Sequence, residues 1–349
     1  MLQLANCPAE ANFGFIYVSD SIADSLESIL HHCKITSGIE HWAGSLGIGI
    51  IAGSQEIYQQ PAISLLLCQF DETQFNIIPP LKNIDELKTR ATVPDNSESC
   101  FAFIHADAYL EPAQDIIGSF EESLNNCFVA GGFTSSRTTQ LQVADEVTTQ
   151  CVSGVIFSEN VPVVTNLTQG CAPLGNKHLI TQAEENVAFS LDHKPALDVF
   201  YNDIGEVLSR DLEKTSSYIF AGLCISGSDL SDYMVRTLVG VDEERKIFAI
   251  NDHLTEGEEL LFCRRDGNTA TADMINMLEK VKKRLHTQPK GGIYVSCLGR
   301  GREQFGDNSE EVKMIHQVLG DFPLTGFFAN GEIHHNHVYG YTGVLTLFV

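Results

Sequence analysis

Two arginines in a glycine-flanked loop have the residue type and spacing best suited to ligand chemistry. Arg300 and Arg302 lie between a β-like run that ends at Cys297 and a helix that Asn308 or Ser309 would begin. A helix N-terminus, free backbone amides and two planar guanidinium groups together suit a small carboxylate or phosphate. The alternative is that both arginines form ion pairs with acidic neighbours. Those neighbours are Glu303, Asp307, Glu310 and Glu311.

Two thiols and one carboxyl could carry out nucleophilic or acid–base chemistry. Cys297 lies at a strand end and Cys171 in a turn, and both are candidates for reactive thiols. Glu332 could act as a general acid or base. The alternatives are small buried cysteines and a solvated glutamate in a turn. Because nothing in the sequence places a histidine beside either thiol, a Cys/His nucleophilic pair is not supported.

Three further motifs fail on their context. Gly47–Ala52 fits part of a dinucleotide-binding fingerprint, but its glycines lie inside a β-like run and no helix opens on them. Gly301–Gly306 has the gap of a phosphate-binding loop, yet Asp307 stands where the lysine must be. The histidines of His334–His337 are short of the usual three or four zinc ligands, and flanking glycines indicate an exposed hairpin. We therefore expect neither a metal nor a cofactor.

The net charge argues against a nucleic-acid-binding protein. The 349 residues include 46 acidic and 22 basic side chains, which gives 22 − 46 = −24. Nucleic acids bind clustered lysines and arginines, and the longest basic run here is Lys282–Arg284. No apolar stretch reaches the roughly 18 residues of a membrane span, and the start lacks a secretory pattern. We expect a soluble globular protein without membrane insertion.

The cysteines indicate a reducing compartment. Ten cysteines are spread along the chain without a C-x-x-C pair, mostly inside apolar runs. This pattern is typical of buried free thiols rather than of a disulfide framework. The expected location is cytoplasmic.

The elements that must position these residues repeat along the chain. Each half reads as β-β-β-α-β-α-β-β-β from its hydrophobic periodicity. Landmarks recur at offsets of 191, 195 and 189 residues, which indicates a duplication: Phe101 and Gly292, Gly131 and Gly326, and Gly154 and Gly343. Adjacent strands without helices between them favour mixed or antiparallel sheets. The expected fold class is α+β, with two duplicated units whose sheets are covered by helices.

A change in amino-acid composition marks the expected domain boundary. Gln169–Gly175 is a turn punctuated by glycine and proline, and Asp192–Pro195 is a second breaker before a helix that opens at Ala196. We expect one domain over residues 1–195 and another over residues 196–349.

The C-terminal third resembles the FIST-C domain of F-box and intracellular signal transduction proteins. The matching segments are Cys297–Arg302, Pro323–Ile333 and Tyr339–Val344. The Gln169–Gly175 turn and the Pro195–Asp198 junction resemble the end of its FIST-N partner. The resemblance implies a sensory module that binds small ligands, amino acids among them, and is linked to signalling. Since the two domains use up the chain, any output would pass through a separate signalling protein.

We therefore expect a cytosolic sensor that binds an amino acid, a related carboxylate or another small anion without catalysis. Two rivals stay open: an enzyme using Cys297 or Cys171 with Glu332, and a pure protein-interaction scaffold. The ligand would lie near the arginine loop, facing the turn after Gly326. The residues expected at this site are Cys297, Arg300, Arg302, Phe305, Gly326, Phe327, Phe328, Glu332, Tyr341 and Thr342.

Overall fold

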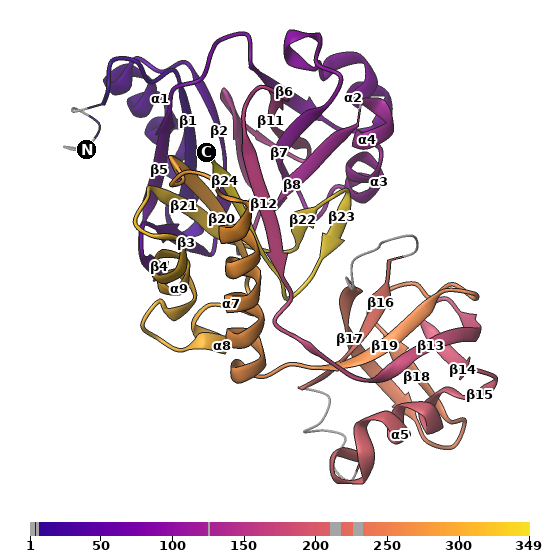
Figure 1. Ribbon diagram of the computed structural model, residues 1–349. Coiled ribbons are helices and arrows are strands. Elements are labelled where there is room, and N and C mark those ends of the chain that lie inside the picture. The colour runs from indigo at the N-terminus through magenta and orange to yellow at the C-terminus, as the bar shows by residue number, and fades with distance from the viewer. Residues whose placement is uncertain (1–3, 5–6, 125, 210–217, 226–232) are drawn as a thin grey trace. The chain divides into compact units, whose positions relative to one another are not determined.

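Figure 1 shows a computed structural model of the chain, which describes residues 4, 7–124, 126–209, 218–225 and 233–349. The chain divides into two compact units, and the first joins both ends of the sequence. The first unit comprises Met1–Thr168 and Met274–Val349, and the second comprises Gln169–Asp273. The second unit thus begins at the glycine-punctuated turn seen in the sequence, and residue 195 lies inside it.

The fold class is α+β, as expected, with mixed and antiparallel sheets. In the first sheet of the first unit, β1 lies parallel to β2 and antiparallel to β5. The strand order is β10-β9-β2-β1-β5. Its strands are β1 (Phe13–Ser19), β2 (His41–Gly47), β5 (Ile63–Cys68), β9 (Leu141–Ala144) and β10 (Glu146–Thr149). A 3-10 turn at Asp20–Ser25 and helix α1 (Leu26–Ser37) connect β1 to β2.

The second sheet has the order β23-β22-β8-β7-β11-β6, with β7 parallel to β8 and antiparallel to β11. Its strands are β6 (Phe75–Leu81), β7 (Cys100–Ala106), β8 (Cys127–Phe133), β11 (Val152–Ser158), β22 (Glu332–His334) and β23 (His337–Tyr339). The helices associated with it are α2 (Ile84–Arg90), α3 (Ala113–Gly118) and α4 (Phe120–Ser123).

The third sheet has the order β12-β24-β20-β21-β3-β4, with β20 parallel to β21 and antiparallel to β24. Its strands are β3 (Gly49–Ala52), β4 (Gln55–Tyr58), β12 (Val163–Thr168), β20 (Gly291–Cys297), β21 (Leu324–Ala329) and β24 (Gly343–Phe348). Helix α7 (Gly267–Arg284) precedes β20, and α8 (Arg302–Phe305) and α9 (Glu310–Leu319) connect β20 to β21.

These sheets share one pattern, which occurs three times in the described residues. Each has two parallel strands joined through helices, an antiparallel strand beside the first of them, and a hairpin beside the second. Each hairpin follows the parallel pair of a different sheet: β3–β4 follows β2 but pairs with β21, β9–β10 follows β8 but pairs with β2, and β22–β23 follows β21 but pairs with β8. The predicted pair of nine-element units is not confirmed, and the repeating pattern is smaller.

Glycines at equivalent places allow the parallel strands to approach each other. They are Gly44 on β2, Gly131 on β8 and Gly326 on β21. At each of them an added Cβ would overlap the carbonyl oxygen of the residue opposite on the parallel strand. Two of the landmark glycines in the sequence are thus explained by close backbone approach.

The inner faces of the three sheets meet in an aromatic core. Phe15 of β1 packs against Phe103 of β7 and Phe348 of β24, with ring centroids 5.7 and 6.0 Å apart. Near the C-terminal ends of β1 and β7 the core also contains polar groups. There the hydroxyl of Tyr17 lies 3.1 Å from Nε2 of His105. Hydrophobic clusters beneath the helices form the outer layers.

The second unit is built on an antiparallel sheet with the order β13-β19-β16-β17-β18-β14-β15. Its strands are β13 (Ala172–Glu184), β14 (Val187–Leu191), β15 (Lys194–Pro195), β16 (Ile219–Cys224), β17 (Tyr233–Asp242), β18 (Ile247–Ile250) and β19 (Glu259–Arg264). Helix α5 (Ala196–Ser209) packs on this sheet through Leu197 and Phe200. Across the described parts of both units, none of the helices combines the length and apolar character needed to cross a bilayer.

Candidate functional site

The side chain of Arg300 is buried in an ion pair with Glu311. Its Nε donates a hydrogen bond to Oε1 of Glu311 at 2.7 Å, and neither side chain is exposed to solvent. Its Nη1 donates to the carbonyl oxygens of Thr168 and Tyr341, both at 3.3 Å. The guanidinium carbon lies 5.2 Å from the ring centroid of Phe305. The expectation that Arg300 is open to an anion is therefore corrected, because Glu311 already supplies its counter-charge.

Glu311 organises the end of β20 from beneath. Its carboxylate accepts hydrogen bonds from the hydroxyls of Tyr294 and Ser296, at 2.6 and 3.0 Å, and from the backbone N–H of Gly301, at 2.9 Å. With Arg300 these donors satisfy a carboxylate that is fully buried. A buried charge needs this degree of pairing, so the cluster fixes the loop after β20.

Arg302 does not converge with Arg300. Its guanidinium carbon lies 4.9 Å from the ring centroid of Tyr58, and its Nε lies 3.3 Å from Oε1 of Glu303. Its side chain is 34% exposed. Each arginine thus follows the ion-pair alternative with a different glutamate, and they do not form a shared anion site.

The aromatic residues expected at the site belong to the packed interior. Phe327 stacks on Tyr17 with ring centroids 5.0 Å apart. Phe328 lies 4.9 Å from the ring of Tyr58. Both are almost completely buried, and Gly326 lies between β20 and β3 in the third sheet. In the structure these three residues contribute to the packing of the first unit.

The structure does bring Cys297 and Glu332 together at the end of β20. Glu332 lies on β22 and is fully buried. Its Oε2 accepts a hydrogen bond from the backbone N–H of Thr342 at 3.0 Å. The thiol of Cys297, which is partly exposed, donates a hydrogen bond to the same carboxyl. With Tyr341, these residues form a group that we call the strand-end site.

The environment of Glu332 favours its neutral form. Burial raises the pKa of this carboxyl to about 8, although the Thr342 amide, the Arg300 charge and the Cys297 thiol each favour the ionised form. At neutral pH the group is therefore a carboxylic acid that can donate a hydrogen bond. The alternative that Glu332 is a solvated glutamate in a turn is wrong, because the hairpin pairs Glu332 with β8 and buries it.

The repeated pattern supplies two internal references for the strand-end site. At the end of the first parallel strand in each sheet, a backbone N–H donates to a carbonyl that precedes the antiparallel strand. These bonds are Cys297 to Thr342 at 2.9 Å, Asp107 to Cys151 at 3.1 Å and Ser19 to Ala62 at 3.0 Å. The backbone arrangement is therefore the same in all three places.

The hairpin residue at these places differs in chemistry. It is Glu332 opposite Gly132, Gln142 opposite Ser45, and Ile50 opposite Phe327. In each case the residue opposite directly follows the closely approached glycine, which is Gly131, Gly44 or Gly326. Gln142 is also fully buried; its Nε2 donates to the Cys151 carbonyl at 3.1 Å, and its Oε1 accepts from the Ser153 hydroxyl at 2.7 Å. An uncharged amide thus satisfies this position, so the backbone does not require a buried carboxyl at Glu332.

Other candidate residues are not members of the strand-end site. Cys171 belongs to the second unit, is buried and lies beside Cys263, whose pKa its thiol raises. His334–His337 forms the turn of the β22–β23 hairpin, as predicted, but β22 is buried and the hairpin is not fully exposed as expected. Burial lowers the pKa of His334 to about 3. Among the described residues, no group of three or more His, Cys, Asp or Glu side chains is arranged to hold a metal ion.

Comparison with known families assigns nearly the whole chain. The FIST N domain matches residues 12–194, and the FIST C domain matches residues 196–335. The uncharacterized protein Rv0628c of Mycobacterium tuberculosis is 28% identical over 331 residues, which cover 88% of this chain and 83% of that protein. The uncharacterized protein Mb0898c of Mycobacterium bovis is 27% identical over 352 residues, covering 95% of this chain and 88% of that protein.

Proposed function

This chain belongs to the FIST family, and on that premise we propose that it senses a small ligand at the strand-end site. FIST domains are associated with signal transduction and sensing. The proposed ligand is an amino acid or a related small carboxylate. The proposed output passes through a separate signalling protein in the cytoplasm.

The observation that carries this proposal is the buried carboxyl of Glu332, because the equivalent positions of the other two repeats hold Gln142 and Ile50. A carboxylic acid that stays protonated at neutral pH can donate its proton to a ligand carboxylate or carbonyl. Within the strand-end site, Cys297 is partly exposed whereas Glu332 is buried, so the thiol would contact a ligand first. The carboxylic acid of Glu332 and the thiol of Cys297 are uncharged hydrogen-bond donors, so they suit a ligand group that accepts hydrogen bonds.

The same electrostatics argue against thiol catalysis at neutral pH. A nucleophilic thiol needs a base or a nearby cation. A protonated Glu332 cannot accept the thiol proton, and the charge of Arg300 is neutralised by Glu311. The contact between Cys297 and Glu332 nevertheless makes a thiol enzyme the second candidate. A Cys297 thiol that reacts with iodoacetamide with an apparent pKa well below about 8.5 would favour the enzyme.

The experiment is a thermal-shift screen of amino acids and small carboxylates with the full chain. A ligand present at about 100 times its Kd stabilises by about 2.7 kcal/mol, and each kcal/mol moves the Tm by about 2–4 °C for this size. Glu332→Ile introduces the residue type that Ile50 supplies at the equivalent place and removes the donor, so the shift should disappear. Cys224→Ser is the matched control, because Cys224 is also partly exposed but lies in the second unit.

The pH dependence of binding gives a second readout. Affinity in the parent should fall as pH rises through about 8, because Glu332 ionises and repels an anionic ligand. Glu332→Gln keeps a donor that does not titrate, so its affinity should stay level over the same range. A ligand that binds parent and Glu332→Ile equally well would place the site elsewhere.

A further inference from the structure

Strand β5 lies at the edge of the first sheet. In the described residues this sheet has five strands, whereas the second and third sheets have six. The extra strands occupy one equivalent place: β6 lies antiparallel to β11, and β12 lies antiparallel to β24. Strand β5 corresponds to β11 and β24, and among the described residues no strand pairs with its outer edge.

The extra strands fill space beneath the helices of their sheets. Ile78 and Leu81 of β6 belong to the cluster that includes α2, α3 and α4 side chains. Val164 of β12 belongs to the cluster that includes α7 and α9 side chains. Without such a strand, the corresponding space in the first sheet is an apolar pocket.

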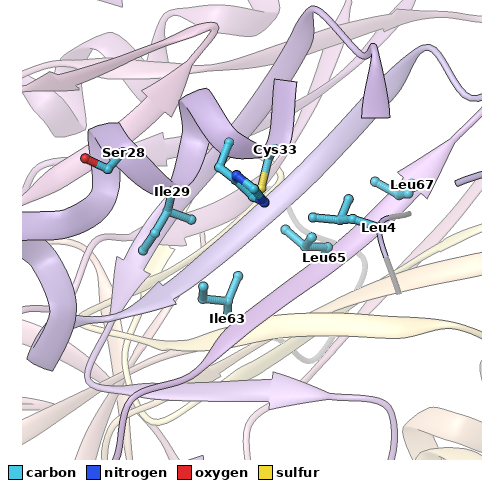
Figure 2. Close-up of a pocket in the computed structure, with 8 residues that line it drawn as sticks. Leu4, Ser28, Ile29, Cys33, Ile63, Leu65 and Leu67 are labelled. Carbon is cyan, nitrogen blue, oxygen red and sulfur yellow. The ribbon is translucent and has the colours of Figure 1, made fainter. Parts of the chain in front are cut away.

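This pocket has a volume of about 510 Å³ and lies between α1 and β5 (Figure 2). Its helix wall includes Ser28, Ile29 and Cys33, and its strand wall consists of Ile63, Leu65 and Leu67. Leu4, from the segment before β1, also lines it. The three strand residues alternate along β5, so they share one face. Ile63 is 45% exposed, and the other two are partly exposed. A row of aliphatic side chains is thus left incompletely covered.

The outer edge of β5 also lacks the usual protection against pairing. Its six residues include no charge and no proline, and its register with β1 has no bulge. Other edges of these sheets are blunted: β6 contains Pro79 and Pro80, β4 and β10 have four residues with a glutamate each, and β23 has three residues. On β12, Nη1 of Arg284 donates to the carbonyl of Thr165 at 2.9 Å. A long uncharged edge readily accepts another strand.

We propose that β5 pairs antiparallel with β5 of a second copy of this chain, forming a two-fold symmetric dimer. The internal references require an antiparallel strand whose apolar side chains face the helix, and β5 itself meets both requirements. With the axis at Leu65, Ile63 of each copy lies opposite Leu67 of the other. One self-complementary contact then completes both sheets and covers both pockets.

The net charge sets the conditions of pairing. Two copies of −24 repel each other at long range, whereas the strand itself carries no charge. The Debye length falls from about 30 to 8 Å between 0.01 and 0.15 M salt, so pairing should strengthen over that range.

The mass of the full chain in solution tests the dimer. Sedimentation at 1–100 µM in 0.15 M salt should show the 38.4 kDa single chain giving way to a particle of twice its mass. Leu65→Lys should weaken association at least tenfold, because it places a charge at the centre of the contact. Val147→Lys is the matched control: Val147 is partly buried in the same cluster but lies on β10, at the opposite edge. It should dimerise as the parent does.

Hydrogen exchange of the parent keeps the test independent of how the variants fold. The outward amides of β5 should be protected at 100 µM and exchange freely at 1 µM. A parent that stays a single chain at 100 µM overturns the proposal. So does equal protection of β5 at both concentrations, which would mean that a segment of the same chain covers the edge. Loss of association in Val147→Lys would place the contact elsewhere.

Discussion

Replacing Glu332 by glutamine should stabilise the first unit and reduce its sensitivity to pH. Glutamine has nearly the same shape, can still accept the Thr342 N–H, and is the residue that the equivalent position carries at Gln142. The substitution therefore removes a buried ionisable group while keeping the local structure. If Glu332 is kept for function rather than for folding, stability should rise.

The magnitude follows from the shifted pKa of Glu332. Burial raises it from the ordinary 4.5 to about 8. Between these values the folded chain holds the proton and the unfolded chain releases it, so rising pH favours unfolding. The contribution of this group is fully present below pH 4.5 and is lost as pH rises to about 8. At about 1.4 kcal/mol per pH unit, the buried carboxyl costs roughly 3 kcal/mol at pH 7 and roughly 5 kcal/mol above pH 8.

The assay is urea unfolding of parent and Glu332→Gln at pH 5, 6, 7 and 8. Fluorescence of Trp42 reports on the first unit, because the chain has one tryptophan and it is buried on β2. The difference in unfolding free energy between the two proteins cancels the other titrating groups. It should increase steadily over this range in favour of the variant.

The reverse substitution is the matched control. Gln142→Glu puts a carboxyl into the equivalent buried position, where it should cost stability with a similar dependence on pH. A difference curve for Glu332→Gln that is flat from pH 5 to 8 would refute the reasoning, since the carboxyl would then titrate normally. A variant less stable than the parent at every pH would show that Glu332 is needed for folding.

Four further substitutions test the structure of the two units by urea unfolding. Arg300→Ala should cost about 3–5 kcal/mol because it leaves Glu311 buried without its partner, whereas Arg302→Ala should cost less than about 1 kcal/mol because its ion pair is exposed. Gly326→Ala should prevent folding of the first unit, since its Cβ would overlap a backbone carbonyl; a folded variant would contradict the close approach. Burial lowers the pKa of His178, but its two carboxylate partners together raise it above 6.5, so the second unit should lose stability as pH rises above 6.5, and His178→Gln should abolish this dependence.

Local pattern was enough to predict many of the elements. The strand Cys100–Ala106, the helix Glu310–Leu319 and the hairpin at His334–His337 all follow from periodicity and turn residues within their own segments. Sheet membership was not predictable in this way. Strand β3 begins two residues after β2 ends, yet it pairs with β21 near the other end of the chain. No local signal distinguishes a hairpin that folds back on its neighbour from one that joins another sheet.

The candidate site shows the same limit. Alternative ion pairs for the arginines could be written from the sequence, and the structure selects Glu311 and Glu303. The burial of Glu332 could not be foreseen, because it depends on which sheet receives the β22–β23 hairpin. A glutamate in a turn is usually solvated, and here the exchange of hairpins removes it from water.

The repeated pattern also explains why the sequence suggested two copies rather than three. Gly44 and Gly131 are 131 − 44 = 87 residues apart, and Gly131 and Gly326 are 326 − 131 = 195 residues apart. The second unit, Gln169–Asp273, accounts for 273 − 168 = 105 of the latter, which leaves 195 − 105 = 90. The spacing is therefore nearly constant once the second unit is treated as an insertion. That insertion precedes the repeat that carries Cys297 and Glu332, and Arg300 of this repeat binds the carbonyl of Thr168, the residue at which the chain leaves the first unit. The same Nη1 also donates to the carbonyl of Tyr341 in the strand-end site, so one side chain joins this site to the last residue of β12 within the first unit.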